Sequence, residues 1–265
     1  MGKSGRKSLG ADALLYGRHA VAAALANPER RWRRLVVLAG HEEEATALLA
    51  GARAMRLPHV NDRGGAAISV LDQSGFAAIL PRHAVHQGLA LEVEPLPEPD
   101  LEDVLRTGPG SGRCIIVVLD QLSDPQNIGA VLRSAAAFGA LVVVIPAHRA
   151  PPRTGALAKA ASGALESVPL VRVVNLARAL DRLKGAGFWI CGLDETAPLS
   201  LAQTDIGERV AIVLGSEGGG MRRLVRERCD FLARLPTRPA QATLNVSNAA
   251  AIALYELIRG TAIRA

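Results

Sequence analysis

The second half of this chain alternates wholly apolar runs of strand length with stretches of helical pattern, and this alternation constrains its fold most. The apolar runs span residues 114–119, 141–145, 188–191 and 210–214. The helical stretches span residues 127–138, 154–164, 175–186, 219–228 and 246–259. Strands that are apolar on both faces are covered on both sides, and their alternation with helices indicates a parallel sheet. We therefore predict an α/β domain over residues 113–265.

The first half mixes shorter helices and strands. Helices are predicted at residues 18–26 and 42–55, and strands at 34–39 and 87–93. Three prolines fall within residues 95–99 and three glycines within 108–112, a composition typical of a linker. The predicted parts are a basic disordered tail at 1–11, a small α/β domain at 12–95, a linker at 96–112, and the α/β domain at 113–265.

The net positive charge of the chain comes entirely from its second half. Residues 1–112 hold 13 basic and 13 acidic side chains, whereas residues 113–265 hold 18 and 12, which gives the net charge of +6. A polyanionic partner would therefore bind mainly to the second domain; the alternative is that the charge only favours solubility. With eight aromatic residues in the chain, RNA binding would depend on charge and shape more than on base stacking.

Composition and motif searches exclude several classes of protein. Cys114, Cys191 and Cys229 lie far apart without a CxxC pair, which argues against disulfides and structural zinc and suits a reducing, cytoplasmic setting. No apolar run is long enough to cross a bilayer, and the N-terminal residues are basic without an apolar stretch, so we expect no secretory signal. His83 and His86 lack further ligands, so no metal is expected. The absence of GxGxxG, GxxxxGK[ST], HExxH and GxSxG disfavours dinucleotide, phosphate-loop and hydrolase chemistry.

Three loops with polar side chains follow predicted strands, where open α/β sheets bind ligands. The first, residues 119–129, leads into the helix that bears Arg133, which could clamp a phosphate or ribose. The second, 213–221, contains Gly215, which would let a ligand approach the backbone. It also contains Glu217, which could accept a hydrogen bond from a ribose hydroxyl or an amine, or orient Arg133. The third, 235–247, contains Asn245 and Ser247. Each loop also has an ordinary structural interpretation, as a solvated arginine, a carboxylate at a helix start, or helix caps.

Together these loops resemble a known family. The runs DPQNIGAVLRSAAAFGA, IVLGSEGGGM and LPTRPAQATLNVSNAAAIALYE are similar to the three signature motifs of the SpoU/TrmH branch of the SPOUT RNA methyltransferases. In the first half, YGRHAVAAAL and HAVHQGLALEV resemble the substrate-binding domain of bacterial 23S rRNA guanosine 2′-O-methyltransferases, and ESVPLVRVVNLARAL is typical of that subgroup. The likeness spans roughly residues 14 to 260.

The resemblance implies a fold, a cofactor and partners. The fold would be a SPOUT α/β domain with a deep trefoil knot, preceded by a small L30e/L7Ae-like α/β domain that presents RNA. The cofactor would be S-adenosylmethionine, contacted largely through the backbone of Gly215, Leu235 and Leu244, with Ile212 and Val213 lining the strand beneath it. The partners would be ribosomal RNA and a second copy of the chain, joined through the C-terminal domain.

The resemblance also assigns the catalytic residues. Asn127, Arg133, Glu217 and Asn245 match motif positions, and Thr243 stands where relatives usually carry serine. The reaction would be attack of a ribose 2′-oxygen on the sulfonium methyl group. Because a guanidinium stays protonated in proteins, we expect Arg133 to stabilise the developing alkoxide and grip the adjacent phosphate. Glu217, Asn245 or water would then take the proton.

Three alternatives remain at this point: a tRNA ribose 2′-O-methyltransferase, a non-catalytic RNA-binding paralogue, and an enzyme that uses another nucleotide cofactor. The separate first domain favours a ribosomal target, because the compact tRNA enzymes generally lack it. The retained motif residues argue against a paralogue without activity, and the absent GxGxxG argues against a dinucleotide enzyme.

Overall fold

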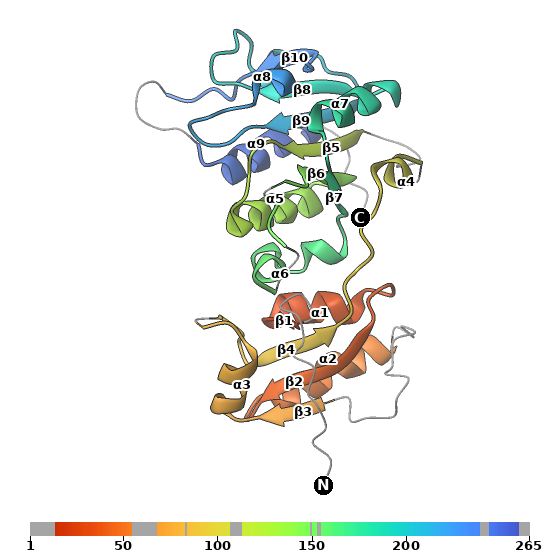
Figure 1. The fold of residues 1–265 in the computed structure, drawn as a ribbon, viewed down its shortest axis with the longest axis vertical. Helices are drawn as coiled ribbons and strands as arrows, with labels where there is room; N and C mark the ends of the chain where they lie inside the picture. Colours follow the sequence, from red (N-terminus) through yellow and green to blue (C-terminus); the bar gives the residue numbers. More distant parts are fainter. Residues whose placement is uncertain are drawn as a thin grey trace. The chain divides into compact units, whose positions relative to one another are not determined.

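The computed structural model describes residues 14–54, 68–82, 84–106, 113–148, 150–152, 155–238 and 244–259. The tail predicted at 1–11, as well as His83 and Thr243, lies outside these described residues. The chain divides into two compact units (Figure 1). The first comprises residues 1–97 and 152–166, and the second comprises 98–151 and 167–265.

The first unit is built on a four-stranded mixed sheet of order β1-β4-β2-β3. Its elements from this part of the chain are β1 (Leu14–Tyr16), α1 (Arg18–Ala26), β2 (Trp32–Leu38), α2 (Glu42–Ala54), β3 (Ile68–Leu71), α3 (Gln73–Ile79) and β4 (Leu89–Val93). Strand β4 runs antiparallel to β1 and β2, whereas β2 and β3 are parallel. The predicted helices and strands are present within two residues of their expected ends. Strands β1 and β3 and helix α3 were not predicted.

The first unit also takes residues from the middle of the second half. Helix α6 (Gly155–Ala161) and the short 3₁₀ turn η2 (Ala164–Glu166) pack in this unit, and Ala158 is buried among Leu15, Val21 and Leu91. The helix predicted at 154–164 is therefore present, but its position in the fold is not the one expected for residues of the second domain. The apolar pattern of a sequence indicates which residues of a helix are buried, but it does not indicate which sheet they pack against.

The second unit contains a six-stranded sheet of order β10-β8-β9-β5-β6-β7 in which every neighbouring pair is parallel. Its elements are α4 (Leu101–Arg106), β5 (Cys114–Leu119), α5 (Pro125–Ala137), β6 (Val142–Pro146), β7 (Leu170–Val173), α7 (Leu176–Gly185), β8 (Trp189–Leu193), η3 (Leu201–Gln203), β9 (Arg209–Leu214), α8 (Arg223–Arg226), β10 (Phe231–Ala233) and α9 (Val246–Ile258). The predicted α/β architecture is confirmed. The trefoil knot stays a prediction, because the loop before α9 includes residues 239–243, outside the described part.

Two predictions for the second half differ from the structure. The proposed linker contains α4, whose Leu101 and Val104 are buried in the same core as Ile116, because a six-residue amphipathic segment is hidden between proline-rich and glycine-rich flanks. The helix predicted at 219–228 is only the four-residue α8, because the preceding residues form a tight glycine turn. Within the described ranges, no helix combines the length and apolar character needed to cross a membrane.

Candidate functional site

The candidate site forms where β5 and β9 end. These strands are paired in parallel along their whole length, with Leu119 opposite Leu214. The N–H of Asp120 continues the pairing by donating to the Leu214 carbonyl at 2.8 Å. The first and second polar loops therefore start side by side at the same edge of the sheet, as expected for ligand sites in parallel sheets.

The first loop leaves the side chain of Asn127 available to other loops. Asp124 caps α5 by accepting the Gln126 N–H at 3.1 Å, and Pro125 takes the first helical position. Capping is therefore done by Asp124, and Asn127 lies three residues further along, in the first turn. Its Oδ1 accepts a hydrogen bond from Asn245 Nδ2 at 3.1 Å, across 118 residues of sequence.

The second loop is a tight turn that needs its glycines. Ser216 and Gly220 exchange backbone hydrogen bonds of 3.1 and 2.9 Å, and Gly218 and Gly220 have φ values of +77° and +59°. A Cβ atom on Gly215 would lie 2.1 Å from the Gly220 carbonyl carbon. The glycine at 215 is thus required by the loop's own backbone, whereas the sequence suggested ligand approach as the reason.

A buried carboxylate that sequence analysis did not single out fixes the end of this turn. Asp120 has no exposed surface, and it accepts from the backbone N of Arg222 at 2.8 Å, from Nε at 2.8 Å and from Nη2 at 2.7 Å. Gln121, at φ +63°, donates from Nε2 to the Gly220 carbonyl at 3.3 Å. The only signal in the sequence is an acid placed directly after six apolar residues, and it does not reveal the partner.

The third loop joins the other two through Asn245. Its Oδ1 caps α9 by accepting Ser247 N at 2.8 Å and Oγ at 2.6 Å, so the capping interpretation is correct for this atom. Its Nδ2 donates to Asn127 Oδ1 and to Glu217 Oε1, the latter at 2.8 Å. Glu217 Oε1 also accepts the N–H of Val246 at 3.3 Å. The structure therefore brings three predicted catalytic residues, Asn127, Glu217 and Asn245, into one hydrogen-bonded cluster.

Arg133 is not part of this cluster. It lies exposed on α5, six residues beyond Asn127 and so about 9 Å further along the helix axis. Its side chain makes no hydrogen bond or ion pair with any residue that the structure describes. Its guanidinium is therefore available to a group of the substrate.

The residues expected to hold the cofactor occupy different environments. Gly215, Leu235 and Leu244 are half-buried, and Gly215 and Leu244 lie in the loops that carry Glu217 and Asn245. Ile212 and Val213 are fully buried in β9 and face opposite sides of the sheet, because side chains alternate along a strand. Thr243 lies outside the described residues. The half-buried leucines are therefore accessible to a ligand, whereas Ile212 and Val213 are not.

The described residues of the site favour chemistry carried out by amide, carboxylate and guanidinium groups. No group of three or more potential ligands is placed to hold a metal ion among the described residues. Burial raises the pKa of Cys191 and of Cys229 to about 12 and also raises the pKa of Cys114, so none of the three is an activated thiolate. An exposed carboxylate, two amides and an arginine can orient a hydroxyl, accept its proton and stabilise an oxyanion.

Comparisons with known proteins cover both halves of the chain. Residues 114–255 match the SpoU rRNA Methylase family, and residues 14–99 match the family described as RNA 2′-O ribose methyltransferase substrate binding. The 23S rRNA (guanosine-2′-O-)-methyltransferase RlmB of Vibrio cholerae is 38% identical over 93% of this chain and 96% of its own. RlmB of Escherichia coli K12 is 36% identical over 93% and 98%.

A solved structure has the same fold. The SpoU methyltransferase AviRb from Streptomyces viridochromogenes, in complex with the cofactor AdoMet, superposes with a TM-score of 0.74 over 93% of this chain and 89% of that chain, at 22% identity. At this identity the likeness establishes the fold.

Proposed function

The chain belongs to the SpoU rRNA methylase family, and from this premise we propose that it transfers a methyl group from S-adenosylmethionine to the 2′-hydroxyl of a guanosine in large-subunit ribosomal RNA. The observation that carries the proposal is the convergence of Asn127, Glu217 and Asn245 at the edge of the parallel sheet. These side chains come from three loops that are distant in sequence, and packing of the core does not require them to meet.

S-adenosylmethionine, when bound, supplies a methyl group on a positively charged sulfur. The ribose 2′-oxygen forms a bond to this methyl carbon while the carbon–sulfur bond breaks, its electron pair remains on sulfur, and the hydroxyl proton leaves. The exposed Arg133 stabilises the developing negative charge on the 2′-oxygen and binds the neighbouring phosphate. Alignment of the hydroxyl with the carbon–sulfur bond contributes the remaining rate increase.

Glu217 or a water molecule beside it takes the proton. Asn245 is fully engaged, because its Nδ2 donates to two acceptors and its Oδ1 caps α9. Glu217 uses Oε1 for both of its hydrogen bonds with described residues, which leaves Oε2 for the substrate. Asn127 therefore positions Asn245, Asn245 orients the carboxylate, and the free carboxylate oxygen supports Glu217 as the proton acceptor.

The RNA target and its location rest on the relatives. RlmB proteins are named for a guanosine of 23S rRNA, and the match at residues 14–99 to a substrate-binding family supports RNA presentation by the first unit. An enzyme of ribosomal RNA works where ribosomes are made, so we place this one in the cytoplasm.

We also propose a homodimer formed through α9. Ile252 and Tyr255 are 44% and 55% exposed on this helix, and Tyr255 extends an apolar surface by an edge contact with Phe138, the residue that follows α5, at 6.3 Å between ring centroids. Exposed apolar side chains that adjoin one another mark interaction surfaces, and a self-complementary surface of this kind suits a two-fold dimer.

The proposal is tested by mapping ribose methylation in total RNA from cells with and without the gene. We expect one 2′-O-methylguanosine of large-subunit rRNA to disappear and to return when the gene is restored. Loss of a mark in tRNA would instead assign the chain to the tRNA enzymes. Calorimetric titration of the purified protein with S-adenosylmethionine should give one site per chain, and absence of binding with and without rRNA would overturn the proposal.

A further inference from the structure

The connection between β6 and β7 carries a helix that belongs to the first unit. Strands β6 and β7 are parallel neighbours, so the chain between them must cross over, and the helix in such a crossover ordinarily covers its own sheet. Here the crossover contains α6 and η2, which pack in the first unit. We call residues 155–166 the docking segment.

Two glycines bring the backbone of the docking segment directly against β1 and α1. A Cβ atom on Gly155 would lie 2.5 Å from the Leu14 carbonyl oxygen and 2.6 Å from the Tyr16 ring. A Cβ atom on Gly163, whose φ is +93°, would lie 2.5 Å from Ala23 Cβ. Contacts as close as these leave no room for any other residue type, so the surfaces are complementary at the level of single atoms.

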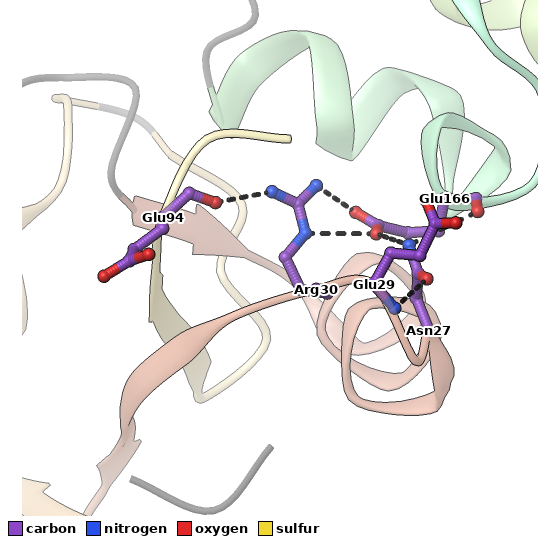
Figure 2. A network of polar contacts seen from close by, with 5 residues as sticks. All are labelled: Asn27, Glu29, Arg30, Glu94 and Glu166. Atoms are coloured by element: carbon purple, nitrogen blue, oxygen red, sulfur yellow. Dashed lines mark hydrogen bonds and ion pairs between the residues drawn. The ribbon is translucent and has the colours of Figure 1, made fainter. Parts of the chain in front are cut away.

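A buried ion pair closes the end of the docking segment (Figure 2). The side chains of Arg30 and Glu166 are each 6% exposed. Arg30 donates from Nη2 to Glu166 Oε1 at 2.5 Å, from Nε to Oε2 at 3.1 Å, and from Nη1 to the Glu94 carbonyl at 2.9 Å. Asn27 Nδ2 adds a bond of 2.8 Å to Glu166 Oε2. All three guanidinium nitrogens and both carboxylate oxygens are therefore used, as a buried charged pair requires.

A third contact involves the two motifs of the first half that the catalytic cluster does not explain. Lys159 of the docking segment donates to Gln87 Oε1 at 2.5 Å, and the N–H of Arg18 donates to the same oxygen at 3.2 Å. Arg18 belongs to the YGRHAVAAAL run and Gln87 to HAVHQGLALEV. These runs therefore meet one another, and both meet the docking segment.

Strand β6 (Val142–Pro146) precedes the docking segment in the sequence. Strand β6 pairs with β5 in parallel, so it ends at the edge of the sheet where β5 and β9 release the loops of Asn127 and Glu217. The crossover thus links the catalytic edge of the methylase sheet with the unit that matches an RNA substrate-binding family.

We propose that the docking segment is the element that couples the first unit to the methylase sheet through the β6–β7 crossover, so that its attachment governs how productively bound RNA is used, with Arg30 and Glu166 as its positioning residues. The inference rests on the function proposed above. Loosening the docking segment would leave RNA and S-adenosylmethionine binding intact and would lower the fraction of time in which the bound ribose is aligned, because alignment is a separate contribution to rate.

The test compares Gly155→Ala with Gly51→Ala in the full-length enzyme. Both are helical glycines of the first unit, but nothing lies within 4 Å of a Cβ at Gly51. For Gly155→Ala we expect hydrogen exchange in residues 155–166 to rise at least tenfold and kcat on an unmodified large-subunit rRNA transcript to fall at least fivefold. The Kd values for RNA and for S-adenosylmethionine should stay within twofold, and Gly51→Ala should match the wild type in every measurement.

Glu166→Gln serves as the second variant, since it keeps the side-chain shape while removing the charge that pairs with Arg30. The turnover is expressed per S-adenosylmethionine-binding site, so that a variant with fewer folded molecules does not show a falsely lowered kcat. The inference would be overturned if either variant combined faster hydrogen exchange in residues 155–166 with a wild-type kcat. It would also be overturned if hydrogen exchange in these residues were unchanged in both variants. A wild-type enzyme that methylates no rRNA would contradict the proposed function instead.

Discussion

Arg133 is exposed on α5 and has no partner among the described residues, so its charge is free to act on substrate. We predict that Arg133→Ala lowers kcat on rRNA by about 10²–10³-fold, the usual cost of removing a group that stabilises a developing oxyanion. Arg133→Lys should recover only part of this, because an ammonium lacks the planar fork that binds phosphate oxygens in pairs. Single-turnover kinetics with saturating donor would measure both.

The control for Arg133 is Arg178→Ala, which removes another exposed arginine from a helix of the same unit, α7. It should leave kcat unchanged. Near-normal turnover of Arg133→Ala with RNA binding retained would refute the role given to this residue.

The buried thiols make stability fall in alkaline solution. Burial, aided by the neighbouring Cys229, raises the pKa of Cys191 from an ordinary 9.0 to about 12, and burial raises that of Cys229 to about 12. Above pH 9 the unfolded chain loses thiol protons that the folded chain keeps, so the free energy of unfolding decreases by up to about 1.4 kcal/mol per pH unit for each thiol. Below pH 9 the two thiols contribute no pH dependence.

Urea unfolding from pH 8 to 11 would measure this slope. The double variant Cys191→Ala with Cys229→Ala should have a lower stability at pH 8, because one buried and one half-buried side chain are truncated, and a flatter decline above pH 9. Equal slopes in the two proteins would show that the thiols ionise freely in the folded state.

At the scale of elements, Asp120 ties the end of β5 to the start of α8 and thereby sets the turn that carries Glu217. We predict that Asp120→Asn weakens S-adenosylmethionine binding at least tenfold and lowers stability by about 1–3 kcal/mol, because the buried carboxylate that accepts three hydrogen bonds is lost. Calorimetric titration and thermal unfolding would measure the two effects.

Asp181→Asn is the matched control for Asp120, since it breaks an exposed ion pair with Arg228 in the same unit. Exposed pairs contribute little, so donor affinity and stability should both stay near the wild-type values. Donor binding by Asp120→Asn at wild-type strength would mean that the turn holds its shape without the clamp.

The sequence pattern predicted long, buried elements well and short ones poorly. Strand β5 coincides with the predicted run 114–119, because six consecutive apolar residues leave little freedom of interpretation. Strands β1 and β10 have three residues each, too few to display a period. Helix α4 was read as linker for the related reason that its amphipathic turn lies between proline and glycine clusters.

The candidate site was predicted as residues but not as contacts. Strand-end position and the family resemblance identified Asn127, Glu217 and Asn245, and the structure joins them. The partnership of Asp120 with Arg222 spans 102 residues and that of Arg30 with Glu166 spans 136. Pairings over such distances are set by strand order and chain crossings, which local periodicity does not encode.

At the scale of the whole molecule, dimerisation should depend on the exposed face of α9. Ile252→Glu would place a charge on the proposed contact, so we predict a shift from dimer to monomer in sedimentation velocity at micromolar concentration, because burying an unpaired carboxylate is costly. Val174→Glu is the control, since Val174 is 94% exposed in the same unit and lies outside α9. A dimer that persists in Ile252→Glu would move the interface elsewhere.

Helix α6 lies between two strands of the methylase sheet in the sequence but packs in the first unit. This limits how the two domains of such enzymes can be exchanged between proteins. A chimera joined at the proline-rich residues 95–99 would combine the N-terminal domain of another protein, the front module, with a crossover that packs against Leu14, Ala23 and Arg30 in this chain. The acid at position 166 would then face a surface without its arginine, and two glycines would meet side chains that had not evolved around them. Grafting of new RNA specificity onto this scaffold should therefore transplant two pieces of sequence together, the front module and the short insert in the middle of the methylase half.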